Sequence, residues 1–215
     1  MRPPLEQGTP PLETIQVSAI IPCLNEEKTL PLCIDKIQRA FAALNVAGEI
    51  VVGDNGSTDA SAEIARRMGA RVVSQPVRGY GAAIRAAVEG SRGEYLIMAD
   101  GDDSYDWSNL QPFIDGLDRG ADLVMGNRFK GTIHPNAMPF LHYHVGNPLL
   151  SRIASLFYGI PLLDFHCGMR AFTRSAYDRM NPGTDGMEFA TEMIIRAARE
   201  GLRIAEVPID LHPDK

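Results

Sequence analysis

The chain has 215 residues, of which 45% are hydrophobic and 22% are charged, and its net charge at pH 7 is −6. This size fits one α/β domain with a complete hydrophobic core and leaves little room for a second domain. The acidic charge balance argues against nucleic-acid binding, because affinity for a phosphate backbone depends on clustered Lys and Arg side chains.

The first 14 residues contain four prolines and few apolar side chains, so we expect a disordered leader over residues 1–14 and a single domain over residues 15–215. No segment approaches the roughly 18 uninterrupted apolar residues of a membrane-spanning helix, and the leader lacks the apolar core of a signal peptide. The three cysteines form no C-x-x-C pair and leave one unpaired, which favours a reduced, cytoplasmic setting.

Strands and helices alternate along the rest of the chain. Residues 16–21 predict a first strand that Pro22 ends, and apolar residues at spacings of four and three predict a helix over 30–44. Such alternation indicates an α/β fold with a mostly parallel central sheet flanked by helices. Further strands are expected at 49–53, 71–74, 95–99, 122–126, 167–173 and 204–208, and further helices are expected to end at Met68, to open at Arg78 and to span 189–199.

Carboxylates follow two of these strands directly. Asp54 follows the strand at 49–53, and Asp100, Asp102 and Asp103 follow the strand at 95–99. Because side chains alternate along an extended backbone, we expect Asp100 and Asp102 on one side and Asp103 on the other. Two carboxylates on one face repel each other, so a cation or a metal-bound diphosphate between them is favoured. From spacing alone, a solvated acidic turn stays open as the alternative.

Several other polar positions allow two interpretations each. The small residues around Gly79 let a backbone approach either a phosphate or another element. Arg128 serves an anion or lies in solvent, whereas Arg170 falls in the middle of the strand at 167–173, where a charge needs a partner. Glu192 is either a functional acid or an acid favoured in the first turns of a helix by the helix dipole.

The segment between Lys130 and Asp164 differs from the rest of the chain. Prolines interrupt it, while Leu, Phe, Ile and Met residues supply apolar bulk. Part of this bulk is expected in the core, and the remainder predicts an apolar acceptor site or a membrane-contacting face, since the segment is too interrupted to span a bilayer. The histidines nearby lack the spacing of zinc ligands and are expected to be polar loop residues.

Seven short motifs follow one another at 22–26, 54–59, 79–81, 100–102, 126–128, 167–170 and 192–193. In this order they resemble the motifs of family 2 glycosyltransferases, most closely the polyprenyl-phosphate sugar synthases of the dolichyl-phosphate mannose synthase branch. The resemblance implies a Rossmann-like A-type nucleotide-sugar glycosyltransferase fold. It also implies that the chain transfers a sugar, with inversion, from a GDP- or UDP-linked donor to a polyprenyl phosphate, assisted by Mg²⁺ or Mn²⁺.

The resemblance assigns roles to single residues as well. Nucleotide binding falls to Pro22, Asn25, Glu26, Asp54, Gly79 and Asp100, with Asp54 on the base and Asp100 on the ribose or sugar. Metal binding falls to Asp102, with Ser104 as a further polar group beside the ion. The catalytic set is Asp100, Asp102, Arg128, Arg170 and Glu192, in which the arginines handle the diphosphate and the acceptor phosphate and Glu192 positions an arginine or the sugar.

The sequence departs from the family pattern at two places. Asn55 replaces the second acid of the usual Asp-Asp-Gly-Ser motif, which leaves the identity of the base open. The chain stops at Lys215, where many relatives continue, so it is either a soluble member or a chain cut before a C-terminal membrane-associating segment. The resemblance implies a cytoplasmic protein, peripheral at the inner face of a membrane and bound there to a lipid phosphate acceptor. Whether it forms a homo-oligomer is left open.

Three other functions compete with this one. A nucleotidylyltransferase should carry a Gly-rich basic loop after its first strand, and residues 22–26 are not such a loop. A nucleotide-sugar-binding protein without catalysis stays open, although Asp100, Asp102, Arg128 and Arg170 argue against it. A glycosyltransferase acting on a hydroxyl acceptor is the third alternative, and it would need a carboxylate to take the acceptor's proton.

Overall fold

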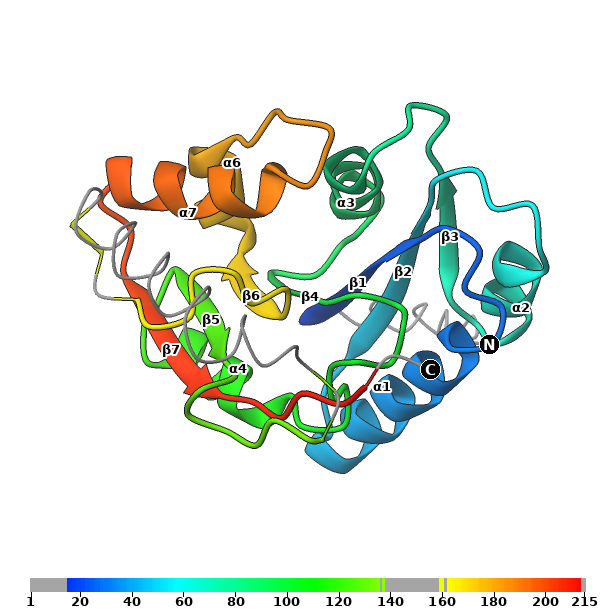
Figure 1. Cartoon of the computed structure of the whole chain (residues 1–215), viewed down its shortest axis with the longest axis horizontal. Helices are drawn as coiled ribbons and strands as arrows, with labels where there is room; N and C mark the ends of the chain where they lie inside the picture. The colour runs from blue at the N-terminus through cyan, green and yellow to red at the C-terminus, as the bar shows by residue number, and fades with distance from the viewer. Residues whose placement is uncertain (1–14, 136, 138–158, 161, 214–215) are drawn as a thin grey trace, which may run out of the picture.

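The computed structural model describes residues 15–135, 137, 159–160 and 162–213, and these residues form a seven-stranded sheet between two layers of helices (Figure 1). The strands are β1 (Val17–Cys23), β2 (Gly48–Asp54), β3 (Arg71–Ser74), β4 (Tyr95–Met98), β5 (Leu123–Asn127), β6 (Arg170–Thr173) and β7 (Ile204–Pro208). The helices are α1 (Leu30–Leu44), α2 (Ser61–Arg67), α3 (Tyr80–Glu89), α4 (Gln111–Asp118), α6 (Arg174–Met180) and α7 (Phe189–Arg199).

The sheet is mostly parallel, as the alternation of strands and helices predicts. Its order is β3-β2-β1-β4-β6-β5-β7, in which β6 runs antiparallel to β4 and β5 and the other neighbours pair in parallel. The carboxyl ends of β1, β2 and β4 therefore meet at one edge, which is where ligands bind in open parallel sheets.

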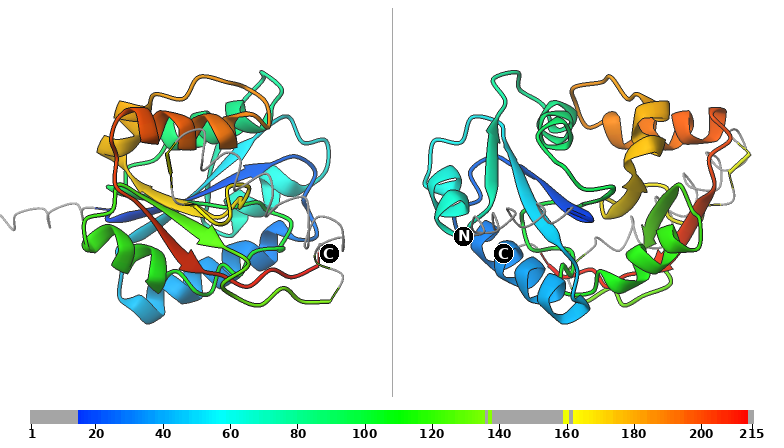
Figure 2. Two further views of the ribbon diagram at one scale, coloured as in Figure 1. Left: turned by 60° about the vertical axis from the view of Figure 1, so that its left-hand side comes forward. Right: turned by 180° about the vertical axis from the view of Figure 1, so that it is seen from behind.

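The alternation of side chains along each strand supplies two cores. Ile21 and Ile97 pack in the core on the side of α1, α2 and α4. Their neighbours Ile20 and Leu96 pack in the core on the side of α3, α6 and α7. Figure 2 shows the same two layers from behind, with α3, α6 and α7 on one side of the sheet and α1 and α4 on the other.

Pro22 lies inside β1, so the expectation that it ends the strand was wrong. The carbonyl of Ile20 accepts a hydrogen bond from Ala99 on the side of β4, and the paired part of β4 ends opposite Ile20, at Met98. Two residues further on, Pro22 faces the same side beyond the end of that pairing. A missing N–H removes no ladder hydrogen bond there, and the strand continues against β2.

The second half of the chain departs from expectation in two ways. The strand predicted over 167–173 begins only at Arg170, so this arginine opens β6 and does not lie in the middle of it. Two helices, α4 and α6, had not been anticipated. Both carry local signals, because Pro112 stands in the first turn of α4 and the Thr173 side chain accepts a hydrogen bond from Ala176 at the start of α6.

Some expectations fall outside the described residues. These are the disordered leader over 1–14, the central part of the apolar segment at 138–158, and any segment beyond the last residues. Within the described part of the chain, no helix combines the length and apolar character needed to cross a bilayer.

Candidate functional site

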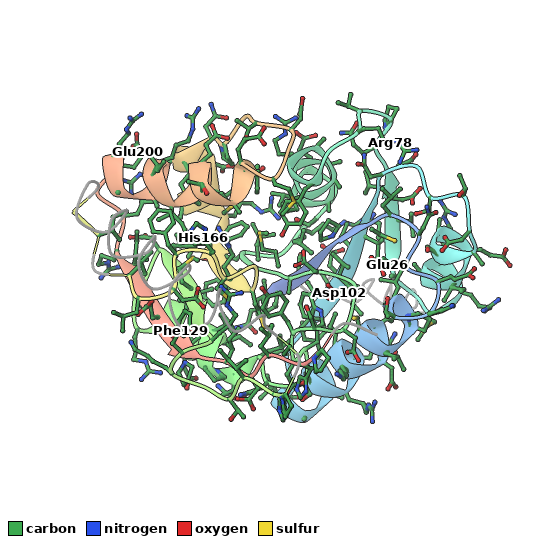
Figure 3. All side chains as sticks on the ribbon, in the orientation of Figure 1. Glu26, Arg78, Asp102, Phe129, His166 and Glu200 are labelled. Carbon is green, nitrogen blue, oxygen red and sulfur yellow. The ribbon has the colours of Figure 1, made fainter. Side chains whose placement is uncertain are left out.

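A pocket of about 340 Å³ opens at the carboxyl ends of β1, β2 and β4. This volume suits a small-molecule ligand. Figure 3 shows two of its acids, Glu26 and Asp102, between the layer of α3 and the layer of α1. The lining residues are Pro22, Cys23, Leu24, Glu26, Asn55, Tyr80, Ala83, Asp100, Gly101, Asp102 and Met187.

The acids after β4 separate as the alternation predicts. Asp100 and Asp102 line the pocket, whereas the buried Asp103 turns away and forms an ion pair of 2.6 Å with Lys36 of α1. The solvated-turn alternative is therefore wrong for Asp103. Asp100 and Asp102 both place their carboxylates in the same pocket.

The environment of Asp100 disfavours the ionised form of its carboxyl group. Its burial, together with the neighbouring charge of Asp102, raises the pKa of Asp100 to about 6. A hydrogen bond with the Tyr80 side chain and the charge of Arg170 act in the opposite direction without cancelling this effect. A carboxylate in this state favours a bound cation, which would relieve the repulsion.

Asp102 has a fixed orientation. Its Oδ1 atom accepts hydrogen bonds from the Ser104 amide at 2.9 Å and from the Ser104 hydroxyl at 2.6 Å. Within the described ranges, no group of three or more His, Cys, Asp or Glu side chains is arranged to hold a metal ion. Mg²⁺ binds nucleotides through one or two carboxylates plus phosphate oxygens and water, so the pair of Asp100 and Asp102 fits such an ion.

Asn25 ties the loop after β1 to the loop after β2, and Asp54 stabilises the loop after β2 from within. The Oδ1 atom of Asn25 accepts a hydrogen bond of 2.8 Å from the Thr58 amide, and Oδ1 of Asp54 accepts one of 3.1 Å from the Ser57 amide. Pro22 and Glu26 line the pocket, but Asn25 and Asp54 are not among its lining residues. Ligand contacts of Asn25 and Asp54 stay predictions.

Asn55 has a structural reason to be an amide. Its Nδ2 donates to the carbonyls of Gln75 and Val77, at 3.0 and 2.7 Å, and its Oδ1 accepts from the Gly79 amide at 2.7 Å. A carboxylate could not donate the first two of these bonds. The departure from the family motif therefore stabilises the loop between β3 and α3.

The backbone of Gly79 is engaged within the protein, and its contact with a nucleotide stays a prediction. Its amide is bound to Asn55, and a Cβ at this position would lie 2.1 Å from the carbonyl oxygen of Asp185. The next amides of the helix start, of Gly81 and Ala82, donate to the carbonyls of Gly186 and Asp185. The small residues admit the loop between α6 and α7, which was the other interpretation of the pattern.

The two arginines of the predicted catalytic set are buried. Arg128 forms a two-pronged ion pair with the buried carboxylate of Asp164, at 2.7 and 2.8 Å, so its interpretation as a solvated residue was wrong. Arg170 donates to the carbonyls of Cys167 and Ala190, and its buried Nε has no hydrogen-bond partner among the described residues. Neither side chain lines the described pocket, and contacts with phosphates stay predictions for both.

Glu192 does not position an arginine of the catalytic set or reach the pocket. Its Oε2 accepts hydrogen bonds from the amides of Gly183 and Thr184 and from the Thr184 hydroxyl, and its Oε1 accepts from Arg196. Burial alone would raise the pKa of Glu192, but these bonds outweigh it and lower the pKa to about 2. Glu192, near the start of α7, therefore stabilises the preceding loop at Gly183 and Thr184.

Seven of the lining residues had not been predicted as site residues, and three of these, Tyr80, Leu24 and Met187, bear on ligand binding. Tyr80 contributes its hydroxyl to Asp100, and Leu24 and Met187 supply exposed apolar surface. The sequence placed Tyr80 between two glycines and Leu24 inside a recognised motif, which were usable signals. Met187 carries no local signal, because the chain reaches the pocket there from a loop far from the other motifs.

The fold and pocket together define a Rossmann-like protein with an acidic ligand site at its strand ends. The family model described as glycosyl transferase family 2 matches residues 18–180. The chain therefore belongs to glycosyl transferase family 2, a family of sugar-transferring enzymes.

Two proteins of Haloferax volcanii illustrate the relationship. The low-salt glycan biosynthesis hexosyltransferase Agl6 is 43% identical over 198 residues, which cover 92% of this chain and 48% of Agl6. The dolichyl-phosphate hexose transferase is 36% identical over 194 residues, which cover 90% of this chain and 81% of that protein. The predicted likeness to polyprenyl-phosphate sugar synthases is confirmed, although the chain spans only about half the length of Agl6.

A solved structure confirms the predicted A-type glycosyltransferase fold. Glucosyl-3-phosphoglycerate synthase from Mycobacterium tuberculosis, in complex with Mn²⁺, UDP and glucosyl-3-phosphoglycerate, superposes with a TM-score of 0.73. The two chains share 26% sequence identity, and the match covers 93% of this chain and 72% of the synthase.

Proposed function

We propose that the protein transfers a sugar from a GDP- or UDP-linked donor to a polyprenyl phosphate. The observation that carries the proposal is the charge of the pocket, whose lining, among the residues that the structure describes, includes Glu26, Asp100 and Asp102 but no Lys or Arg. An anionic diphosphate would bind beside these acids only with a cation between them. The names of the relatives support the reaction class, since one is a dolichyl-phosphate hexose transferase and a structural neighbour contains Mn²⁺ and UDP.

The pocket residues would divide the work as follows. Asp102, oriented by Ser104, and Asp100 would hold Mg²⁺ or Mn²⁺, which when bound neutralises charge on the departing diphosphate. Tyr80 orients the Asp100 carboxylate, and the charge of Arg170 favours its ionised form. The two carboxylates would thereby hold the cation that the anionic leaving group of the donor requires.

The acceptor is proposed to be a phosphate because the described acids of the site are engaged otherwise, Glu26 by a hydrogen bond from the Thr29 hydroxyl. A hydroxyl acceptor loses a proton as it attacks, whereas a phosphate is already ionised at pH 7. Glu192 is occupied by loop donors, and Asp100 and Asp102 are proposed for the cation. A single displacement with inversion follows, in which the protein mainly holds the acceptor phosphate in line.

An assay of sugar transfer tests the proposal. The protein is incubated with UDP- or GDP-sugars, with Mn²⁺ or with excess EDTA, and with either a polyprenyl phosphate or a free sugar as acceptor. The proposal expects a lipid-linked sugar phosphate that forms only with metal. Transfer to the free sugar, with none to the polyprenyl phosphate, would contradict it. Co-sedimentation with vesicles that contain the lipid phosphate tests the peripheral membrane location separately.

A further inference from the structure

We infer that Met187 is a wall of the donor pocket that contacts the nucleoside of the donor, and that Glu192 is the positioning residue that holds it there. This inference rests on the proposed function, because it names how the same pocket grips its donor. It also gives a role to the loop between α6 and α7, residues 181–188, which is called the α6–α7 loop below.

The exposure of Met187 points to a ligand. Its side chain is 69% exposed, and it lines the pocket together with Leu24, another of the five large hydrophobic side chains exposed in the described residues. Exposed apolar side chains around a pocket with a few polar groups are typical of ligand sites. The acids lie among these walls and suit the diphosphate with its cation. The apolar surface of Leu24 and Met187 suits the flat face of a nucleobase, and the flexible thioether of Met adapts to such a face.

Glu192 fixes the first half of the α6–α7 loop. Its Oε2 atom accepts hydrogen bonds from the Gly183 amide at 3.0 Å, the Thr184 amide at 2.9 Å and the Thr184 hydroxyl at 2.7 Å. The Oε1 atom accepts from Arg196 at 2.7 Å. Four donors on one carboxylate are more than a solvated acid at the start of a helix would gather, so the loop is built around this side chain.

The second half of the loop is fixed against α3, which carries Tyr80 and Ala83 into the pocket. The carbonyl of Asp185 accepts from the Ala82 amide at 3.1 Å, and that of Gly186 accepts from the Gly81 amide at 3.3 Å. Arg85 of α3 binds the Gly183 carbonyl and the Asp185 carboxylate. Met187 follows directly after these anchors, so its position depends on them.

This arrangement predicts an effect on donor affinity without an effect on the chemical step. A contact with the nucleoside is the same in the bound donor and in the transition state, because the reacting bond lies at the sugar. Loss of Met187 should therefore raise KM and the Kd for the nucleotide and leave kcat nearly unchanged. Loss of Glu192 should do the same through the loop.

The test measures the Kd for UDP and GDP with Mn²⁺, and the KM and kcat for the matching donor sugars. The variants are Met187→Ala, Glu192→Ala and the double variant. Leu32→Ala is the matched control for an exposed apolar side chain, and Glu63→Gln is the control for an exposed helical acid. We expect Met187→Ala to raise Kd and KM about five- to tenfold, which corresponds to the loss of one partly buried apolar contact. We expect the controls to match the wild type.

The double variant separates positioning from any independent role of Glu192. If Glu192 acts through Met187, the double variant should bind the nucleotide no more weakly than Glu192→Ala alone. Fully additive effects would overturn the positioning role. Glu192→Gln keeps one carbonyl acceptor for Thr184 and should fall between the wild type and Glu192→Ala.

The outcomes distinguish this inference from the proposed function. Wild-type protein that binds neither UDP nor GDP with Mn²⁺ would overturn the proposed function and the inference with it. Wild-type binding that Met187→Ala leaves unchanged would overturn the inference alone. Weaker binding of the donor sugar, with unchanged binding of the free nucleoside diphosphate, would place Met187 on the sugar and contradict the nucleoside contact.

Discussion

The pocket and the structure around it contain the same types of charged residue in opposite electrostatic states. The surrounding structure, called the frame below, comprises the α6–α7 loop with Glu192, the pair of Arg128 and Asp164, and the loop between β3 and α3. In the pocket, Asp100 is half-buried beside Asp102, and burial with this like charge raises its pKa to about 6. In the frame, the hydrogen bonds that Glu192 accepts outweigh its burial and lower its pKa to about 2. A carboxylate that accepts several hydrogen bonds from the protein stabilises the structure around it. A carboxylate that lies beside a like charge favours a bound cation.

The arginines repeat this difference. Arg128 belongs to the frame, because the buried carboxylate of Asp164 meets it with two hydrogen bonds and also accepts from its backbone amide. Arg170 donates to two carbonyls, has a buried Nε with no partner in the described part of the chain, and favours the ionised form of Asp100 through its charge. The comparison predicts that frame variants lose stability and that pocket variants lose activity.

The largest expected effect comes from breaking the buried ion pair between Arg128 and Asp164. Asp164→Ala leaves the Arg128 charge buried without its partner and should cost about 3–5 kcal/mol of the free energy of unfolding. Urea unfolding of the variant measures this loss. Arg128→Met with Asp164→Ala should recover part of the stability, since neither member of the pair then leaves a buried charge without its partner. Wild-type stability of Asp164→Ala would show that the pair does not belong to the frame.

The next effect concerns the pocket. Asp102→Asn should lower the transfer rate about a hundredfold, some 3 kcal/mol in the activation barrier, because one of the two carboxylates proposed for the cation is lost. Its thermal stability should equal or exceed that of the wild type, since the repulsion with Asp100 is relieved. Asp178→Asn, on the exposed surface of α6, is the matched control. Normal turnover of Asp102→Asn in excess EDTA would remove the metal role.

Asn55 belongs to both regions, because it lines the pocket and its side chain stabilises the loop between β3 and α3. Asn55→Asp introduces the second acid of the Asp-Asp-Gly-Ser motif but leaves the carbonyls of Gln75 and Val77 without their donor, at a cost of about 1–3 kcal/mol. Thermal unfolding measures the change, and Asn109→Asp, at an exposed position, is the control. An unchanged melting temperature would mean that the loop between β3 and α3 does not need these bonds.

The smallest expected effect is a dependence on pH. The pKa of Glu192 is lowered in the folded protein, so its contribution to stability is present above the unfolded value of about 4.5 and is lost as the pH falls toward about 2. The difference in stability between the wild type and Glu192→Gln should therefore narrow between pH 5 and pH 2. Thermal unfolding at several pH values measures it. A difference that stays constant over this range would contradict the proposed ionised state.

The same electrostatic comparison explains which site predictions succeeded. The alternation of side chains after β4 correctly separated Asp100 and Asp102 from Asp103, because the backbone geometry of a strand exit is local. The contacts of Gly79 and Glu192 could not be predicted, because both depend on the α6–α7 loop, which approaches α3 only in the folded chain, and their functional roles stay predictions. The position of Pro22 within β1 depends on where the neighbouring strand β4 stops.

The sequence by itself determined the seven strands in chain order, the mostly parallel sheet, the family, and the acids at the strand ends. These properties follow from periodicity and from short motifs, which act over a few residues. Only the tertiary structure decided which charges are neutralised, because the partners are remote in the chain. Asp164 lies 36 residues from Arg128, and the loop that covers Gly81 lies more distant still. Coulomb energy depends on the distance between charges in space, and desolvation depends on burial. The sequence could therefore supply the charged residues but not decide which charges are neutralised.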